Sequence, residues 1–391
     1  MRAAKNQNIP AACVQALYWA MIAAFFGFFT AFLLENGYSD VQVGWISTII
    51  YLVSTLLGSL TGYITDMLIP AKKLLILSFL FSIPFVILVP LTVGSFPLVL
   101  GCIIIVSVLQ ILMCGVVDAW IMRIREKHTE LSYPLTRSAG SLVYAIAAYG
   151  VGLLIARFGY AYAFGANIVF LLATVVAMLF LENVPVQGRR ETDEKPLSFW
   201  KALSGLARCR EYVIYVAAMI LYFYGMRLTL VFQPNLIFAV GGTSADVGAA
   251  CAIAAVFEIP FVLMMTRADK FAKPEMCFFS LLIGACKGLM MLLFPTVGAY
   301  LGAQVFQAVS YGFQISFSLY YIQRVTPPHL YATAIMVYTT ANMGISCMLA
   351  ALTGGYMFEV SDTLLLSASS VTMVLAAAVF ALTFVKRRSA Q

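Results

Sequence analysis

The chain has 391 residues, of which 62% are apolar and 10% are charged, and its formal net charge is +7 at pH 7. Soluble globular proteins are about half apolar and about one quarter charged, so this composition excludes a water-soluble domain and indicates a protein surrounded by lipid. The eight cysteines show no CxxC spacing, which favours neither a disulfide framework nor a metal site. We therefore expect no metal and no cofactor.

Twelve apolar segments follow one another along the chain. They lie at 11–34, 42–64, 74–92, 96–118, 137–156, 161–181, 212–238, 246–265, 275–294, 298–321, 331–357 and 363–385. Because a spanning helix needs about 20 mostly apolar residues, we predict an all-α membrane protein with twelve transmembrane helices. The first segment follows Arg2 and Lys5 without a small-residue cleavage site, so we expect it to be retained.

Basic residues occupy alternate connections between these segments. They are Arg2, Lys5, Lys72, Lys73, Arg123, Arg125, Lys127, Arg189, Arg190, Lys195, Lys201, Arg208, Arg210, Arg267, Lys270, Lys273, Arg324, Lys386, Arg387 and Arg388. The opposite connections carry only Arg157. This positive-inside asymmetry predicts that both termini are cytoplasmic. It also accounts for the net charge without nucleic acid, and we expect a multi-pass monomer in the cell inner (cytoplasmic) membrane.

The chain divides into two similar halves around a polar stretch. We predict an N-terminal six-helix bundle at 1–182, a cytoplasmic linker at 183–210 and a C-terminal six-helix bundle at 211–391. Before helix 2 stands SDVQVG (39–44), and before helix 8 stands SADVG (244–248). An acid closes each of these two helices at nearly the same distance, which favours an internal duplication.

A short motif after helix 2 resembles one in a known family. Residues 62–66 (GYITD), followed by Lys72 and Lys73, are similar to the helix 2–3 motif of the major facilitator superfamily, although the family's second glycine is missing. A weaker copy stands at 266–270 (TRADK). The resemblance implies two pseudo-symmetric six-helix bundles with the substrate near mid-membrane between them. It implies cytoplasmic gating contacts for Asp66, Lys72, Lys73 and Asp269.

Five ionisable residues lie in or beside the predicted spans: Asp118, Arg137, Arg227, Glu258 and Lys287. A charge at the bilayer centre costs about 2.5–3.5 kcal/mol on insertion scales, so it usually marks function or an ion pair. Two acids and three bases permit two pairs, with one cation left for an anionic or hydroxyl-rich ligand. The alternatives are solvation at the interface, snorkelling of Arg227 and a structural Glu258–Lys287 pair.

Several of these positions resemble the lactose permease branch of the superfamily and the neighbouring phenylpropionate-permease-like group. Residues 117–120 (VDAW) are similar to the helix 4 segment with the sugar-binding glutamate, and 136–140 (TRSAG) to the helix 5 start with its partner arginine. Tyr144 falls where an aromatic residue stacks on the sugar. Glu258 matches the essential helix 8 glutamate, and Lys287 stands where the family has an arginine. The resemblance implies substrate binding by Asp118, Arg137 and Tyr144, and proton coupling by Glu258 and Lys287.

Helix 10 departs from lactose permease because it lacks the histidine and glutamate of the proton relay. Instead Gln304, Gln307, Tyr311 and Gln314 share one helical face. They are either interhelical hydrogen-bonding groups or a cavity wall that binds hydroxyls. The complete predicted substrate-binding set is Asp118, Arg137, Tyr144, Trp19, Gln304, Gln307, Tyr311 and Asn342.

Together these patterns predict a secondary active transporter that imports a small hydroxylated solute, either a sugar or a glycoside, by proton symport with alternating access. The alternatives are a permease for an aromatic acid or a nucleoside, and a facilitated uniporter. An enzyme is not indicated, because the sequence has no HExxH motif and both histidines fall in predicted cytoplasmic loops.

Overall fold

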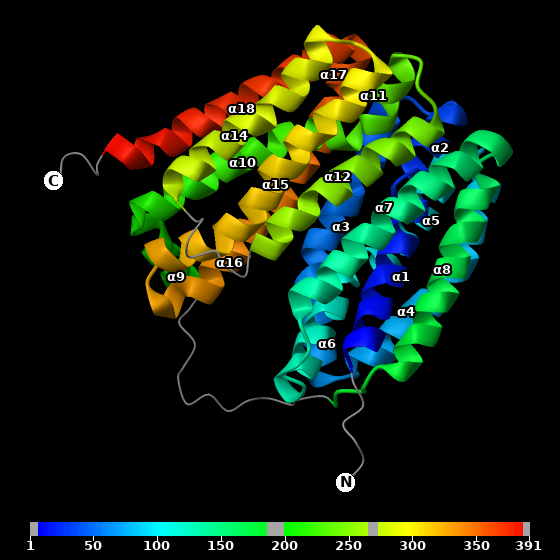
Figure 1. Ribbon diagram of the computed structural model, residues 1–391, viewed down its shortest axis with the longest axis horizontal. Coiled ribbons are helices and arrows are strands. Elements are labelled where there is room, and N and C mark those ends of the chain that lie inside the picture. The colour runs from blue at the N-terminus through cyan, green and yellow to red at the C-terminus, as the bar shows by residue number, and fades with distance from the viewer. Residues whose placement is uncertain (1–6, 186–198, 265–272, 386–391) are drawn as a thin grey trace. The chain divides into compact units, whose positions relative to one another are not determined.

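The computed structural model describes residues 7–185, 199–264 and 273–385, and every regular element in these ranges is helical (Figure 1). The described residues form two compact units. The first takes 7–38, 53–185 and 242–259; the second takes 39–52, 199–241, 260–264 and 273–385. The all-α prediction is confirmed.

The helices of the first unit are α1 (Asn8–Phe26), α2 (Phe29–Glu35), α4 (Ala71–Leu91), α5 (Phe96–Gln110), α6 (Cys114–Lys127), α7 (Tyr133–Phe158) and α8 (Ala161–Phe180). Those of the second unit are α9 (Phe199–Arg208), α10 (Arg210–Val231), α11 (Gln233–Ala239), α14 (Pro274–Leu293), α15 (Val297–Val325), the 3₁₀ helix η2 (Pro328–Leu330), α16 (Tyr331–Thr339), the π helix η3 (Thr340–Ser346), α17 (Cys347–Val360) and α18 (Asp362–Val385). Two helices, α3 (Asp40–Met67) and α12 (Ser244–Met264), contribute residues to both units.

Eleven stretches of the described chain are long and apolar enough to cross a membrane, which makes this a multi-pass membrane protein. The remaining predicted span, 298–321, lies in α15, a helix of 29 residues. At 1.5 Å per residue, a helix of this length exceeds the thickness of the hydrocarbon core. Its hydropathy is reduced by four glutamines.

Several predicted spans are interrupted helices. The span at 212–238 consists of α10 and α11, which are separated at Phe232. Pro234 is at the start of α11, where its missing N–H interrupts the hydrogen-bond ladder at little cost. The span at 96–118 is likewise divided into α5 and α6.

The first unit is built around α1, which packs against both α7 and α8 (Figure 1). A buried polar network joins α1 to α4, α5 and α8. Asn167 Nδ2 donates to the backbone oxygen of Met21 at 2.9 Å and to Gln110 Oε1 at 3.1 Å. Gln110 Nε2 donates to Ser82 Oγ at 2.9 Å. These bonds satisfy polar groups that would be costly to bury unpaired.

In the second unit, α10 packs against α18, and α14 packs against both α15 and α18. Hydroxyl groups connect α10 to α15: Tyr215 donates to Ser318 Oγ, and Tyr222 lies 2.8 Å from Ser310 Oγ. Tyr338 also reaches Ser318 Oγ, at 2.5 Å. Hydrogen bonds of this kind stabilise the association of helices in membranes.

The duplicated motifs have the same packing role in the two units. A Cβ atom at Gly248 of α12 would lie 2.4 Å from the backbone oxygen of Ala148 of α7, within the first unit. A Cβ atom at Gly44 of α3 would lie 2.5 Å from the backbone oxygen of Ala351 of α17, within the second. Only glycine allows either approach, so the matched spacing in the sequence corresponds to matched helix packing.

The predicted bundles at 1–182 and 211–391 follow chain order, whereas the compact units exchange two segments. Residues 39–52 belong to the second unit, and 242–259 belong to the first. The bundle boundaries stay a prediction. For the functional residues, the consequence is that Glu258 belongs to the same unit as Asp118 and Arg137.

Candidate functional site

Asp118 of α6 is held by a glutamine from α1. Gln15 is fully buried, and its Nε2 donates to Asp118 Oδ1 at 2.6 Å. The other end of the same amide, Oε1, accepts from Trp19 Nε1 at 3.0 Å. The second carboxylate oxygen of Asp118 lies 4.0 Å from Cys114 Sγ, which is a weak contact. Gln15 therefore fixes the carboxylate and the indole relative to each other.

Arg137 of α7 covers the other side of the indole. Its Cζ atom lies 4.3 Å from the centroid of the Trp19 ring, which is a cation–π contact. Its Nη1 donates to Ser141 Oγ at 3.2 Å, one turn further along α7. In the part of the chain that the structure describes, no ion pair joins Arg137 to Asp118. The two charges interact electrostatically across the cluster instead.

Gly140 provides the space for the indole. A Cβ atom there would lie 2.7 Å from Trp19 Cδ1. The predicted segment 136–140 thus supplies both the arginine that covers the ring and the glycine that the ring packs against. Tyr144, one turn further, meets Trp19 edge-on at a centroid distance of 6.2 Å and an interplanar angle of 72°.

Glu258 joins this cluster through α12. It is half-buried and interacts electrostatically with Arg137 and Tyr144. The hydroxyl of Tyr144 also faces Cys251, two turns earlier on α12. Five predicted site residues are therefore brought together in the first unit: Trp19, Asp118, Arg137, Tyr144 and Glu258. When ionised, the two acids and one base of this set carry a net charge of −1.

The predicted residues of the second unit make contacts of their own. Lys287 of α14 is 1% exposed, and its Nζ donates to Gln307 Oε1 of α15. Gln304 is fully buried, and its Nε2 donates to the backbone oxygen of Tyr300 at 3.0 Å. Gln314 Nε2 donates to Ser280 Oγ at 2.6 Å. The bonds of Gln307 and Gln314 join α14 to α15, as expected of interhelical hydrogen-bonding groups, whereas the bond of Gln304 stays within α15. The cavity-wall role stays a prediction.

Tyr311 and Asn342 complete the predicted set in the second unit. Tyr311 meets Phe223 edge-on at a centroid distance of 6.2 Å. Asn342 lies in the π helix η3, and it is 1% exposed. Glu258 and Lys287 belong to different units, so their predicted pairing stays a prediction.

The predicted gating residues are only partly covered. Asp269 and the side chain of Asp66 lie outside the described residues. Lys72 Nζ donates to the backbone oxygens of Leu179 at 3.2 Å and Leu181 at 2.9 Å, at the C-terminal end of α8. A lysine at this place satisfies carbonyls that the helix leaves unpaired. Lys73 is exposed.

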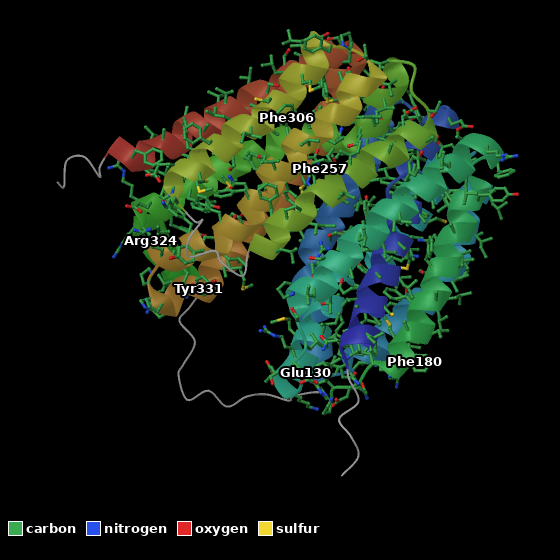
Figure 2. All side chains as sticks on the ribbon, in the orientation of Figure 1. Glu130, Phe180, Phe257, Phe306, Arg324 and Tyr331 are labelled. Carbon is green, nitrogen blue, oxygen red and sulfur yellow. The ribbon has the colours of Figure 1, made fainter. Side chains whose placement is uncertain are left out.

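A polar cluster that the sequence did not indicate lies where α8 ends. Glu182 Oε1 is 3.0 Å from Lys127 Nζ, and Glu182 Oε2 is 2.8 Å from His128 Nε2. Glu130, labelled in Figure 2 at the end of the first unit, approaches His128 Nδ1 at 3.3 Å. The hydrogen bond between His128 and Glu182 raises the pKa of His128 and lowers the pKa of Glu182.

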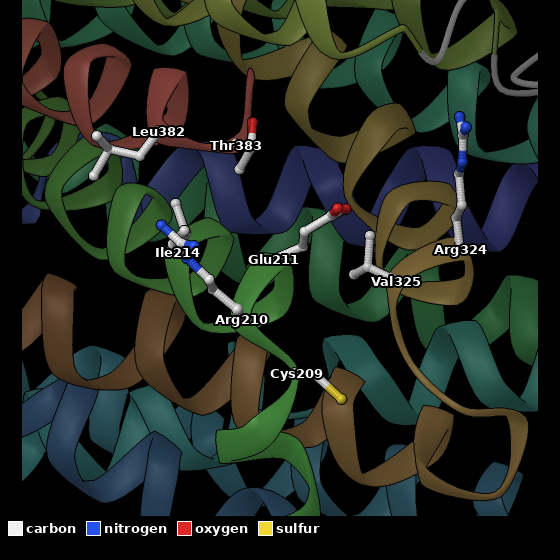
Figure 3. Close-up of a pocket in the computed structure, with 8 residues that line it drawn as sticks. All are labelled: Cys209, Arg210, Glu211, Ile214, Arg324, Val325, Leu382 and Thr383. Atoms are coloured by element: carbon white, nitrogen blue, oxygen red, sulfur yellow. The ribbon is translucent and has the colours of Figure 1, made fainter. Parts of the chain in front are cut away.

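A cavity of about 380 Å³ lies in the second unit, where α10 begins and α15 and α18 end (Figure 3). Its walls include the charged side chains of Arg210, Glu211 and Arg324 and the apolar side chains of Ile214, Val325 and Leu382. None of the predicted substrate-binding residues lines it. The cavity is therefore separate from the candidate site.

Comparisons with known proteins agree with this architecture. The family model for the Major Facilitator Superfamily matches residues 11–351. The maltose permease of Geobacillus stearothermophilus is 25% identical over 346 residues, which is 88% of this chain and 86% of that protein.

Two solved structures share the fold of this chain. A mutant of the nucleoside transporter NupG has a TM-score of 0.82 at 14% identity, over 97% of this chain and 100% of that one. A D-xylose-proton symporter has a TM-score of 0.70 at 15% identity, over 95% of this chain and 96% of that one. Identities this low bear on the fold alone.

Proposed function

This chain belongs to the major facilitator superfamily, and on that premise we propose that it imports a small hydroxylated solute, a sugar or glycoside, together with a proton. Members of this superfamily are secondary transporters, not enzymes. Alternating access, with the two halves moving around a central substrate, is the mechanism of such folds. We further propose that the protein acts as a monomer in the inner (cytoplasmic) membrane.

The observation that carries this proposal is the cluster of Asp118, Gln15, Trp19 and Arg137 in the first unit. A carboxylate accepts hydrogen bonds from hydroxyl groups, and a guanidinium donates several. The rings of Trp19 and Tyr144, which meet edge-on, offer apolar ring surface beside these charges. A sugar ring presents the matching combination of hydroxyl edges and an apolar face.

The charge of this cluster supports the proposal of proton coupling. Asp118, Glu258 and Arg137 sum to −1, so one bound proton makes the set neutral. A net charge is costly within a membrane, and the protein therefore reorients more readily when the set is neutral. Glu258 is our proposed proton carrier, with Lys287 compensating its charge when it is ionised. Asp66, Lys72, Lys73 and Asp269 are our proposed cytoplasmic gating residues.

A nucleoside is the second candidate for the substrate. Ribose offers hydroxyl groups to Asp118 and Arg137, and the base would stack on one of the two rings of Trp19 and Tyr144. An aromatic acid would use the same rings, with its carboxylate on Arg137. Facilitated uniport would require no proton, so a pH dependence of uptake distinguishes it from symport.

The test is charge movement on a solid-supported membrane with purified protein in proteoliposomes. The panel comprises monosaccharides, disaccharides, glycosides, nucleosides and aromatic acids at several pH values. We expect a pH-dependent current with a sugar or glycoside that disappears in Asp118→Asn. The matched control is Asp362→Asn at the start of α18, which we expect to leave the current unchanged. Currents with nucleosides or aromatic acids alone would contradict the sugar proposal.

A further inference from the structure

Arg227 is a cation in a candidate membrane span, and it has no acidic partner among the residues that the structure describes. It lies in α10, which forms the span Arg210–Val231. The described acids of the second unit are Asp40, Glu211, Glu275, Glu359 and Asp362. No ion pair joins Arg227 to any of them. Its electrostatic neighbours are Cys347, Tyr51 and Tyr311, which are neutral at pH 7.

The contacts that Arg227 makes are with uncharged side chains, and they include hydrogen bonds to Tyr51 and Cys347. Its Cζ atom lies 5.9 Å from the centroid of the Tyr51 ring. Its Nη2 donates to the thioether of Met343 at 3.5 Å, and a thioether is a poor acceptor. Its Nε is buried and has no hydrogen-bond partner among the described residues. A buried donor left unpaired in this way is destabilising, which points to a missing acceptor.

A second unpaired polar group lies on the π helix η3, the element that contains the Met343 contact of Arg227. Both amide atoms of Asn342 are buried without a hydrogen-bond partner in the described chain, and the residue is 1% exposed. The next residue, Met343, is the one that Arg227 touches. Cys347 lies near both residues, because its Sγ donates to the backbone oxygen of Asn342 at 3.3 Å and it also interacts with Arg227.

The π helix is held in place against α10. Ser346 Oγ donates to the backbone oxygen of Ile220 of α10 at 3.1 Å. Single π turns inside α-helices are rare and occur often at functional sites. The segment around Asn342 therefore combines a rare helix type, the π helix, with a buried side-chain amide that has no hydrogen-bond partner in the described chain.

We propose that Arg227 and Asn342 form a carboxylate-binding subsite in the second unit, so that the transported solute is a hydroxylated acid of the sugar-acid class. A guanidinium presents paired donors that match a carboxylate, and the amide of Asn342 can donate a further bond. Three of the five ionisable residues of the predicted spans are basic and two are acidic, so a carboxylate on the solute lowers their excess of positive charge. The inference rests on the proposed function, since it assigns a substrate class to that transporter.

The experiment compares matched neutral and acidic probes on purified protein in proteoliposomes. The pairs are D-glucose with D-glucuronate, and methyl β-D-glucoside with methyl β-D-glucuronide. Affinity is measured by charge movement and by ligand-dependent thermal stabilisation. In the unmodified protein we expect the acidic member of at least one pair to bind at least 10-fold more tightly. We expect Arg227→Gln to abolish that preference. Arg227→Lys keeps the positive charge but lacks the paired donors of the guanidinium, so we expect it to retain part of the preference.

Two further variants separate binding from folding. Arg157→Gln removes an exposed arginine at the end of α7 that covers Phe158 at 5.2 Å, and we expect the acid preference to persist in it. Asn342→Leu replaces an unpaired buried amide with an apolar side chain of similar size. We expect this variant to be at least as thermostable as the unmodified protein, yet to lose acid preference. A structural role for Asn342 would instead lower its thermostability.

The outcomes distinguish this subsite from the transport function. Equal affinity within both pairs, or an acid preference that persists in Arg227→Gln, overturns the subsite. If neutral sugars still drive currents that require Asp118 in that case, the proposed function is retained and only the carboxylate-binding subsite is rejected. If the acid preference depends on Arg227 but the currents persist in Asp118→Asn, the subsite stands and the assignment of Asp118 fails.

Discussion

Gln15 and Asp118 form a fixed pair, although 103 positions separate them in the chain. The glutamine amide donates to the carboxylate at 2.6 Å with one end and accepts from the Trp19 indole with the other. This single side chain therefore sets the orientation of both the acceptor and the aromatic surface in the first unit. A buried amide with both ends engaged has few other orientations available.

Replacement of Gln15 by leucine should impair substrate binding more than folding. The hydrogen bond to a charged group contributes about 1.5–3 kcal/mol, so we expect the affinity for the transported solute to fall about 10- to 100-fold. Charge movement as a function of solute concentration measures this change. An unchanged affinity in a well-folded Gln15→Leu protein would show that Asp118 needs no support from α1.

Gly140→Ala should displace the indole of Trp19. The new Cβ atom would lie 2.7 Å from Cδ1 of that ring, so the indole has to move away from Arg137 and Tyr144. We expect an altered tryptophan emission spectrum and a weaker affinity for the solute. Gly150→Ala is the matched control on the same helix, because a Cβ atom there meets nothing within 4 Å. If the two variants behave alike, Gly140 does not position the ring.

Much of the fold follows from the sequence because apolar length and loop charge are local properties. Eleven of the twelve predicted spans correspond to candidate membrane spans of the described chain. The separation of α10 from α11 at Phe232 was not predicted. The resemblance in helices 4, 5 and 8 led to Asp118, Arg137 and Glu258, which the structure brings together in the first unit. Their individual roles stay predictions.

What the sequence could not supply depends on how each helix is rotated and which neighbour it meets. Gln15 was recognisable only as a polar residue in a span, since its pairing with Asp118 arises from the packing of α1 beside α6. Chain order placed Glu258 in the second half, whereas its segment of α12 packs in the first unit. Likewise, the sequence could not show that Arg227 meets Met343 of a distant helix and no acid among the described residues.

Asn167→Leu should destabilise the first unit without touching the candidate site. The change removes the bonds from Asn167 Nδ2 to the backbone oxygen of Met21 and to Gln110 Oε1. Interhelical hydrogen bonds in membranes contribute about 0.6 kcal/mol each on average, so we expect the free energy of unfolding to fall by about 1–2 kcal/mol. Denaturant titration in detergent micelles measures it. Asn36→Ala, which loses only a local bond to Phe32, is the control.

The contact between His128 and Glu182 should make the stability of the first unit depend on pH. The pKa of His128 is raised above its ordinary value of about 6.5 by its hydrogen bond to Glu182. Its contribution is therefore complete below about pH 6.5 and is lost as the pH rises through the raised value. The pKa of Glu182 is lowered by the same bond, so its contribution is present above about pH 4.3 and is lost at lower pH.

Thermal unfolding of the unmodified protein and of His128→Gln between pH 5 and pH 9 tests this window. We expect the difference in melting temperature to be largest near pH 5–6 and to shrink towards pH 9, because the imidazolium loses its charge over that interval. The effect is small, since Glu182 is one third exposed and water screens the pair. The control is His329→Gln, which removes an exposed histidine of the second unit. A difference that grows with pH, or an equal one in the control, contradicts the assignment.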